Sequence, residues 1–303
     1  MDTWGEAAMS EPESEIPEAV PLEPPAEISV DQMLARLSEC SGFDFAAAKT
    51  EYEYYSTRAQ LAVDNSPLYD RLFALQQELA GELVAGKITG VDRWASGESE
   101  FRTVVKTWES LVDKLYRVNR EENALFSNPP ILPTVSQTAQ NDHANLQRWI
   151  TPPIAGEVLD DLVRTKFVVP FVDGVVEVGD RLTQIFDELG VRRFRRFHAK
   201  DSGYHARHYY ALVEVPGDDS IPPSTVSLEI KVLTKMQDQL GELTHLLYEK
   251  HRTGALKLEK KRKSAWQFDS PDFLATYLGH SGHFFEAKIC DLKDTILKLE
   301  QGA

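Results

Sequence analysis

Apolar residues recur along the chain at the spacing of buried helix faces. Leucines stand three or four positions apart at 68, 72, 75, 79 and 83, which predicts a helix over 68–84. The same spacing predicts helices over 175–189, where Gly190 supplies a stop, and over 236–252. A shorter capped helix is expected over 31–37, and one or two more over 273–299.

Four other segments are rich in β-branched and aromatic residues and predict strands. They cover residues 160–169, 194–198, 208–215 and 224–233. Because strands and helices intermix, the pattern favours an α+β, α/β-like fold with a mixed sheet of about five strands flanked by helices. Further helices precede and follow this block.

Charge divides the chain unevenly and suggests its organisation. The net charge of the 303 residues is −15, and residues 1–30 carry −8 of it, with five prolines and no lysine or arginine. Such a segment cannot bury enough apolar surface to offset its ordering entropy, so we expect a disordered acidic tail. The remaining divisions are a helical region over 31–89, a central domain over 90–252 and a helical extension over 253–303.

Composition excludes several classes of protein. There are only two cysteines and no apolar run long enough to span a membrane, so we expect a cytoplasmic protein without a membrane partner. The net negative charge argues against general DNA binding. A local basic site remains compatible with it.

A group of polar residues recurs at helical spacing in residues 101–118. Its members fall four positions apart, which predicts one cationic helical face made of Arg102, Lys106, Ser110 and Lys114. Like charges at this spacing repel one another, and a bound polyphosphate would relieve that repulsion. The alternative is a solvated face on which Glu109 and Asp113 are the ion-pair partners.

The strand-rich block carries candidate metal and nucleotide ligands. Asp161 and Glu229 lie in two different predicted strands, and carboxylates from neighbouring strands can hold Mg²⁺ bound to nucleotide phosphates. Between them, Gly203 permits a tight turn and Tyr204 offers a ring on which a base can stack. Phosphate contacts are expected from the basic residues around this turn, which are Lys200, Arg207 and His208.

The order of these motifs resembles the synthetase domain of the RelA/SpoT alarmone enzymes over about residues 90–252. The matching segments are VKTWESLVDKL (105–115), DDLVRTKFVV (160–169), KDSGYHARH (200–208), LEIKVLT (228–234) and HLLYEK (245–250). The resemblance implies a nucleotidyltransferase-like fold. It also implies transfer of the β,γ-pyrophosphate of ATP to a ribose 3′-hydroxyl, giving a (p)ppGpp-type alarmone from GDP or GTP.

The resemblance assigns roles to residues of this chain. The ATP phosphates would be held by Arg102, Lys106, Ser110 and Lys114. Asp161 and Glu229 would be the catalytic residues and the ligands of Mg²⁺, with Glu229 also helping to deprotonate the 3′-hydroxyl. Tyr204 would stack the acceptor base, with Lys200, Arg207 and His208 nearby.

Departures from the family pattern leave the acceptor open. Arg164 stands where the family has glycine, Lys166 and Leu233 where it has arginine, and Lys231 where it has glutamine. The variant spelling is closer to toxic small alarmone synthetases, some of which act on the 3′-CCA end of tRNA. The alternatives are therefore a tRNA or adenine-nucleotide acceptor, and a non-catalytic nucleotide-binding interaction protein on the same fold.

Several expectations concern regulation and partners. The chain has no His-Asp hydrolase motif, so an active protein would only synthesise, and an antitoxin or an oligomeric partner could restrain it. The basic run 257–263, followed by Trp266 and Phe268, could dock an RNA backbone or could simply end a solvated helix. We also expect the acidic tail to compete with the polyanion for the basic cleft.

Overall fold

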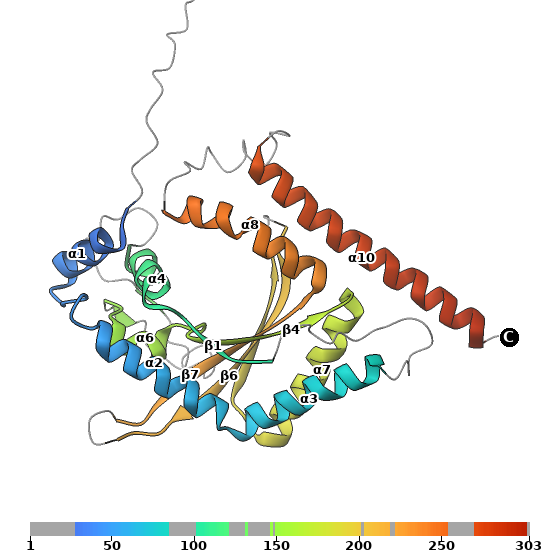
Figure 1. Cartoon of the computed structure of the whole chain (residues 1–303), viewed down its shortest axis with the longest axis horizontal. Coiled ribbons are helices and arrows are strands. Elements are labelled where there is room, and N and C mark those ends of the chain that lie inside the picture. Colours follow the sequence, from blue (N-terminus) through green and yellow to red (C-terminus); the bar gives the residue numbers. More distant parts are fainter. Residues whose placement is uncertain are drawn as a thin grey trace, which may run out of the picture.

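A mixed sheet of five strands lies at the centre of the computed structural model (Figure 1). The structure describes residues 28–84, 101–120, 131–132, 146–147, 149–200, 203–218, 222–253 and 270–301. In spatial order the strands are β1 (Val104–Val105), β4 (Val163–Val169), β7 (Ser224–Thr234), β6 (His205–Val215) and β5 (Arg193–Ala199). Strands β4 and β7 pair in parallel and the other neighbours pair antiparallel. The predicted α+β class is thereby confirmed.

Strand register separates the two faces of the sheet by chemistry. Glu229 on β7 lies opposite Tyr210 on β6 and Arg164 on β4. Because Cα partners point to the same side of a sheet and neighbours alternate, one face collects the polar side chains. We call it the polar face, and its members are Arg164, Lys166, Phe194, Arg196, His198, His208, Tyr210, Glu229 and Lys231.

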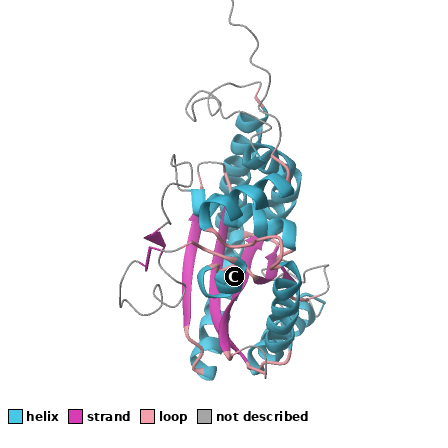
Figure 2. Cartoon of the chain, turned by 90° about the vertical axis from the view of Figure 1, so that its left-hand side faces the viewer, coloured by secondary structure: helices cyan, strands magenta, loops and turns pink. Residues whose placement is uncertain are grey.

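The opposite face is apolar and covered by helices. Its buried residues on β7 are Val226, Leu228, Ile230 and Val232. Helix α7 (Val172–Leu189) packs against it, and α3 (Pro67–Val84) packs against α7 (Figure 1). Seen from the side, the long strands run next to one another with helices along one side of them (Figure 2).

Helix α7 approaches the sheet closely because it carries a glycine at the contact. A Cβ on Gly179 would collide with the hydroxyl of Tyr209 and would lie 3.1 Å from its ring carbon Cζ. Tyr209 is buried on β6 and its ring also packs against Phe186 of α7. The sequence thus matches a small residue on the helix to a large one on the strand.

The N-terminal helices surround the start of α4 (Trp108–Arg120). Helix α1 (Val30–Ser41) begins with a capping box between Ser29 and Gln32 and packs against α4. Helix α2 (Lys49–Asp64) follows, and the hydroxyl of Tyr52 donates a 2.6 Å hydrogen bond to the backbone oxygen of Lys106. These helices fix the backbone that leads into α4.

Two helices complete the chain. Helix α8 (Lys235–Thr253) continues directly from β7, and α10 (Pro271–Gln301) packs along α8 and α7. The C-terminal segment is thus one long helix (Figure 1), and its predicted apolar positions Leu292, Ile296 and Leu299 are partly or fully exposed. No helix within the described ranges is long and apolar enough to cross a bilayer.

The remaining short elements lie between α4 and β4. The turn η1 (Pro152–Ile154) and helix α6 (Ala155–Val158) lead into β4, and α6 packs against β7. Strands β2 (Ile131–Leu132) and β3 (Leu146–Gln147) pair separately from the main sheet. The predicted acidic tail, up to residue 27, and the basic run 257–263 lie outside the described residues.

Candidate functional site

Two lysines converge on one aspartate at the start of β4. Lys114 Nζ lies 2.5 Å from Asp161 Oδ1, and Lys106 Nζ lies 3.1 Å from Asp161 Oδ2. The side chain of Lys106 is only 8% exposed. Asp160 Oδ1 lies 3.8 Å from Lys114 Nζ on the same side, and Asp160 also pairs with Arg196. Two carboxylates therefore face three cationic side chains, Lys106, Lys114 and Arg196.

Electrostatics at this cluster follow from burial and from the opposed charges. Burial alone would raise the pKa of Asp161, but the ammonium groups of Lys114 and Lys106 outweigh it and hold that pKa well below its usual range. Burial lowers the pKa of Lys106, and the nearby charges of Lys114 and Arg164 add to this effect, although Asp161 opposes it. A polyanion would compensate these crowded positive charges.

The predicted cationic helical face is wrong in its first half. Helix α4 begins at Trp108, so only Ser110 and Lys114 lie on it. Arg102 and Lys106 precede it and flank β1, which pairs with β4, and the N–H of Lys106 donates to Leu162 O over 2.9 Å. Pairing with β4 thus replaces helical hydrogen bonds, while Lys106 and Lys114 still meet at Asp161. Arg102 has an exposed side chain, and Ser110 has a half-buried one.

Glu229 lies at the centre of a hydrogen-bonded chain on the polar face. His208 Nδ1 is 2.8 Å from Glu229 Oε1, and His208 Nε2 is 3.0 Å from the hydroxyl of Tyr204. Since a carboxylate only accepts, Nδ1 donates to Glu229, and Nε2 shares the second hydrogen bond with the Tyr204 hydroxyl. The imidazole of His208 therefore links the Tyr204 hydroxyl to the Glu229 carboxylate and fixes the orientation of that carboxylate.

The surroundings of Glu229 favour its ionised form despite burial. Its side chain is 7% exposed, and burial would raise its pKa. The hydrogen bond from His208 and the charge of Lys231, whose Nζ is 3.7 Å from Oε2, outweigh burial and lower the pKa. Asp161 acts on this pKa in the opposite sense.

Gly203 and Tyr204 lie directly before β6, and we call this pair of residues the acceptor turn after the predicted role of Tyr204. The N–H of Lys200 donates to Tyr204 O over 3.0 Å, and Gly203 takes a φ of 80°, which favours glycine. Lys200 Nζ lies 5.5 Å from the centroid of the Tyr204 ring. Burial raises the pKa of the Tyr204 hydroxyl, and the charges of Glu229 and Asp238 raise it further, so it stays protonated.

Arg207 is not brought together with the other predicted acceptor residues. It neighbours His208 on β6, so the alternation of the strand directs it to the opposite face. A Cβ on Gly179 of α7 would lie 3.6 Å from its Nη1. The structure thus gathers Lys200, Tyr204 and His208 but separates Arg207 from them.

Sequence reasoning missed an aromatic and cationic group beside the predicted site. The rings of Phe194 and Tyr210 stack with centroids 4.5 Å apart, and Arg196 lies over both. Arg196 Nη1 also contacts Asp160 Oδ2 at 2.8 Å. The sequence does show that the alternate positions 194, 196 and 198 share one face of β5, and the register of β5 on β6 places that face beside His208 and Tyr210.

His198 is a further missed member of the polar face. Its ring centroid lies 4.1 Å from that of His208. Burial, then the charges of His208 and Lys200, lower the pKa of His198 to about 4. It is therefore neutral at pH 7.

The oxygen ligands of this site fit a magnesium ion that arrives with a nucleotide. The charge of Asp161 acts to raise the pKa of Glu229, and both residues are hard carboxylate donors. Mg²⁺ is commonly bound by one or two carboxylates together with substrate phosphates. Within the described ranges no three His, Cys, Asp or Glu side chains form a metal-binding group on their own.

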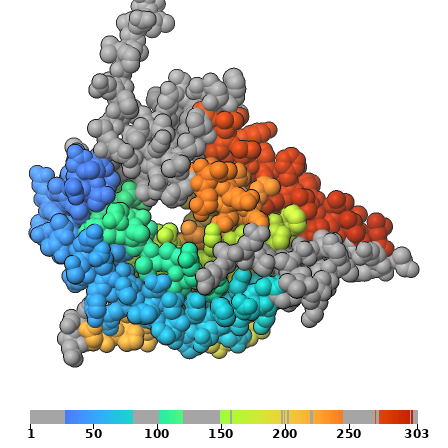
Figure 3. All heavy atoms as spheres, in the orientation of Figure 1, coloured from blue at the N-terminus to red at the C-terminus, as the bar shows by residue number. Residues whose placement is uncertain are grey.

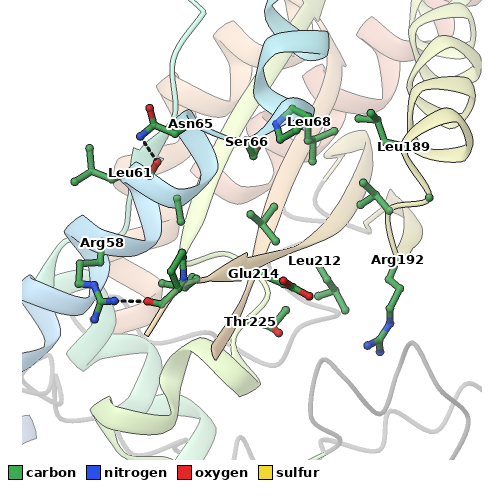
Figure 4. A pocket seen from close by; sticks show the side chains of 17 residues that line it. Arg58, Leu61, Asn65, Ser66, Leu68, Leu189, Arg192, Leu212, Glu214 and Thr225 are labelled. Atoms are coloured by element: carbon green, nitrogen blue, oxygen red, sulfur yellow. Dashed lines mark hydrogen bonds between the residues drawn. The ribbon is translucent and has the colours of Figure 1, made fainter. Parts of the chain in front are cut away.

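Two hollows are visible on the molecule. Figure 3 shows one between α4, which carries Lys114, and α8, which carries Asp238. A separate cavity of about 870 Å³ lies at the other end of β7, between α2, the turn after α7 and the ends of β6 and β7 (Figure 4). Arg58, Glu214 and Thr225 line it, and no predicted site residue does.

Comparison with known proteins finds structural neighbours only. No protein-family model and no curated protein sequence matches the chain. Small alarmone synthetase 1 from Bacillus subtilis, solved with its product pppGpp, is 13% identical, with 82% of this chain and 99% of that chain covered and a TM-score of 0.47. A GTP pyrophosphokinase family protein from Streptococcus pneumoniae is 20% identical, with 78% and 93% covered and a TM-score of 0.46.

A third solved structure is smu.1046c from Streptococcus mutans UA159. It is 15% identical, with 82% of this chain and 97% of that chain covered and a TM-score of 0.48. Two of the three structures are described as a small alarmone synthetase and a GTP pyrophosphokinase family protein.

Proposed function

We propose that this protein is a synthetase-only pyrophosphotransferase that moves the β,γ-pyrophosphate of ATP to the ribose 3′-hydroxyl of GDP or GTP. The observation that carries the proposal is the arrangement of charged and hydrogen-bonded side chains around Asp161 and Glu229. Asp161 is held between Lys106 and Lys114, while Glu229 is linked through His208 to Tyr204. The motif resemblance in the sequence names the same residues.

Lys106 and Lys114 bind the triphosphate in this proposal. Both already contact a carboxylate, and exchanging it for phosphate oxygens would preserve their ion pairing while relieving their mutual repulsion. Transfer of a phosphoryl-type group depends on positioning and on neutralisation of developing charge. The buried Lys106 and the half-buried Lys114, both held in place by Asp161, would supply both.

Tyr204 and Glu229 serve the acceptor. The Tyr204 ring stacks the base, which leaves the ribose next to the polar face. Glu229 is ionised and accepts the proton of the 3′-hydroxyl. A bond forms between that oxygen and the β-phosphorus, the bond from the β-phosphorus to the α,β-bridging oxygen breaks, and AMP leaves.

His208 and the metal ligands complete the assignment. His208 holds the carboxylate of Glu229 in one orientation through its 2.8 Å contact. Asp161 and Glu229 would hold Mg²⁺, which neutralises phosphate charge when it is bound. Arg102 and Ser110 remain proposed contacts to the outer phosphates, and we leave Arg207 out because it lies on the other face.

The acceptor is the part of the proposal with open alternatives. Arg164, Lys166 and Lys231 add positive charge to the polar face, although Lys166 is paired with Asp238 at 2.7 Å. This surface is compatible with a tRNA 3′ end or an adenine nucleotide. A non-catalytic nucleotide-binding protein has no need of the ionised, oriented Glu229.

Incubation with γ-³²P-labelled ATP and Mg²⁺ tests the proposal. The acceptors supplied in parallel are GDP, GTP, ADP and deacylated tRNA. We expect label on GDP and GTP, because the site offers the Tyr204 ring for stacking of the nucleobase and the Glu229 carboxylate as a proton acceptor beside the ATP phosphates. Label confined to ADP or tRNA would show that GDP and GTP are not the acceptors, while the proposed pyrophosphate transfer would stand. Label on none of the four would contradict the proposal.

A further inference from the structure

The first half of α10 crosses the acceptor turn through two glycines. A Cβ on Gly279 would lie 2.8 Å from the carbonyl carbon of Gly203 and 2.9 Å from its Cα. A Cβ on Gly203 would lie 2.5 Å from the backbone oxygen of Thr276. Since real Cβ atoms do not approach backbone so closely, only this pair of glycines permits the crossing.

A buried amide joins the same two segments. Gln237 of α8 is 2% exposed, its Oε1 accepts from the N–H of His205 over 3.2 Å, and its Nε2 donates to Gly279 O over 3.0 Å. One side chain thus satisfies a backbone donor of β6 and a backbone acceptor of α10. Losing it would leave both groups unpaired in a buried place.

Histidine rings extend the contact on the outer side. His205 Nε2 lies 3.1 Å from His280 Nδ1, and the His205 ring stacks on that of His283 with centroids 4.0 Å apart. Burial, then the charges of His283 and His280, lower the pKa of His205 to about 4. The stacked rings therefore pack as neutral groups at pH 7.

Tyr204 stands between the two residues that α10 holds. Gly203 precedes it and His205 follows it, and its hydroxyl continues to His208 and Glu229. Lys106 and Lys114 are the residues proposed to bind ATP. They lie near β1 and β4, on the other side of β7 from β6. We infer that α10 positions Tyr204 for binding of the acceptor, acting through Gly279 and Gln237, and that it does not affect binding of ATP. This inference rests on the proposed function.

Hydrogen exchange and kinetics on three variants of the full chain test the inference. Gly279→Ala pushes α10 away from the turn, and Gln237→Leu removes the buried bridge. Lys293→Met is the matched control, because Lys293 lies on the same helix, roughly 21 Å from Gly279 along α10, and its loss breaks the 2.7 Å ion pair with Asp173 of α7. All three are expected to loosen α10, but only the first two touch the turn.

The first readout needs no activity. We expect the amide of His205 to exchange about tenfold faster in Gly279→Ala and Gln237→Leu, because local opening sets its exchange rate, and to be unchanged in Lys293→Met. The second readout compares the KM for the acceptor with the KM for ATP. We expect the acceptor KM to rise about tenfold in the first two variants with the ATP KM unchanged.

Failure of the inference and failure of the proposed function are distinguishable. Unchanged exchange at His205, or equal changes in all three variants, would overturn the positioning role whatever the activity. Faster exchange with acceptor and ATP KM rising together would also overturn it. A wild-type protein that labels no acceptor would instead remove the proposed function, and the exchange data would still show whether α10 holds the turn.

Discussion

Glu229 is a buried carboxylate that its neighbours keep ionised and fixed. His208 donates to it, Lys231 is 3.7 Å away, and its side chain is 7% exposed. Burying a charge is unfavourable unless it is paired and hydrogen-bonded, so this arrangement requires specific partners. Such a group is ionised at neutral pH and is therefore available to accept a proton.

Replacing Glu229 tests that role. Glu229→Gln keeps the shape but removes the charge and the base, so we expect kcat for pyrophosphate transfer to fall at least about a hundredfold. Glu286→Gln is the matched control, because Glu286 is another buried glutamate, 1% exposed on α10, outside the site. Initial rates with saturating ATP measure the effect, and retained activity in Glu229→Gln would remove it as the base.

Glu286 itself predicts a pH dependence of stability. Burial raises its pKa to about 7, partly opposed by the nearby Thr234 side chain. The folded state therefore holds a proton that the unfolded state releases near pH 4.5, so the contribution of Glu286 to stability is greatest below that pH and falls as pH rises towards 7.

The variant Glu286→Gln should remove this dependence. We expect the free energy of unfolding of the wild type to fall by about 2 to 3 kcal/mol between pH 4.5 and pH 7 relative to the variant. Urea unfolding across this range measures it. Parallel pH profiles for the two proteins would show that Glu286 does not hold the proton.

At the scale of elements, the contact between α7 and the sheet depends on Gly179. Gly179→Ala introduces a Cβ that collides with the buried Tyr209, so we expect a loss of about 1 to 3 kcal/mol despite the better helix propensity of alanine. Gly241→Ala in α8 is the control, because its Cβ would meet nothing within 4 Å. Thermal unfolding followed by circular dichroism compares them, and equal melting temperatures would contradict the close packing.

The periodic elements of the fold could be predicted from the sequence, and β1 could not. Residues 101–107 continue the helical spacing of α4, but Val104 and Val105 pair with β4 and Thr165 Oγ1 donates to Arg102 O over 2.9 Å. These partners lie about 60 residues away in the chain, and local periodicity carries no information about them. Tertiary pairing therefore overrides the local preference.

The candidate site shows the same limit. Asp161, Glu229 and Tyr204 could be found because each belongs to a compact motif. Phe194 and Tyr210 come together only through the register of β5 on β6, which a single strand does not reveal. Arg207 lies apart from Lys200, Tyr204 and His208, and the alternation of β6 already separates it from its neighbour His208.

For the whole molecule, the distribution of charge gives a salt-dependent prediction. Residues 1–27 carry −8, and the proposed ATP site holds two crowded lysines. If the acidic segment competes with ATP there, deleting residues 1–27 should raise activity about twofold or more at low salt and little at about 1 M salt, where screening is strong. Rates of both proteins across a salt series measure this, and equal rates throughout would leave the segment without that role.

The central claim is the transfer of an intact pyrophosphate, and the fate of the two outer phosphates of ATP tests it most directly. The reaction is run in parallel with β-³²P-ATP and γ-³²P-ATP, with GDP as acceptor, and the nucleotides are separated and counted. The account predicts that both labels appear in the same product, in equal amounts, with one AMP formed for each molecule of that product. Transfer of the γ label alone with accumulation of ADP, or no transfer of either label, would contradict it.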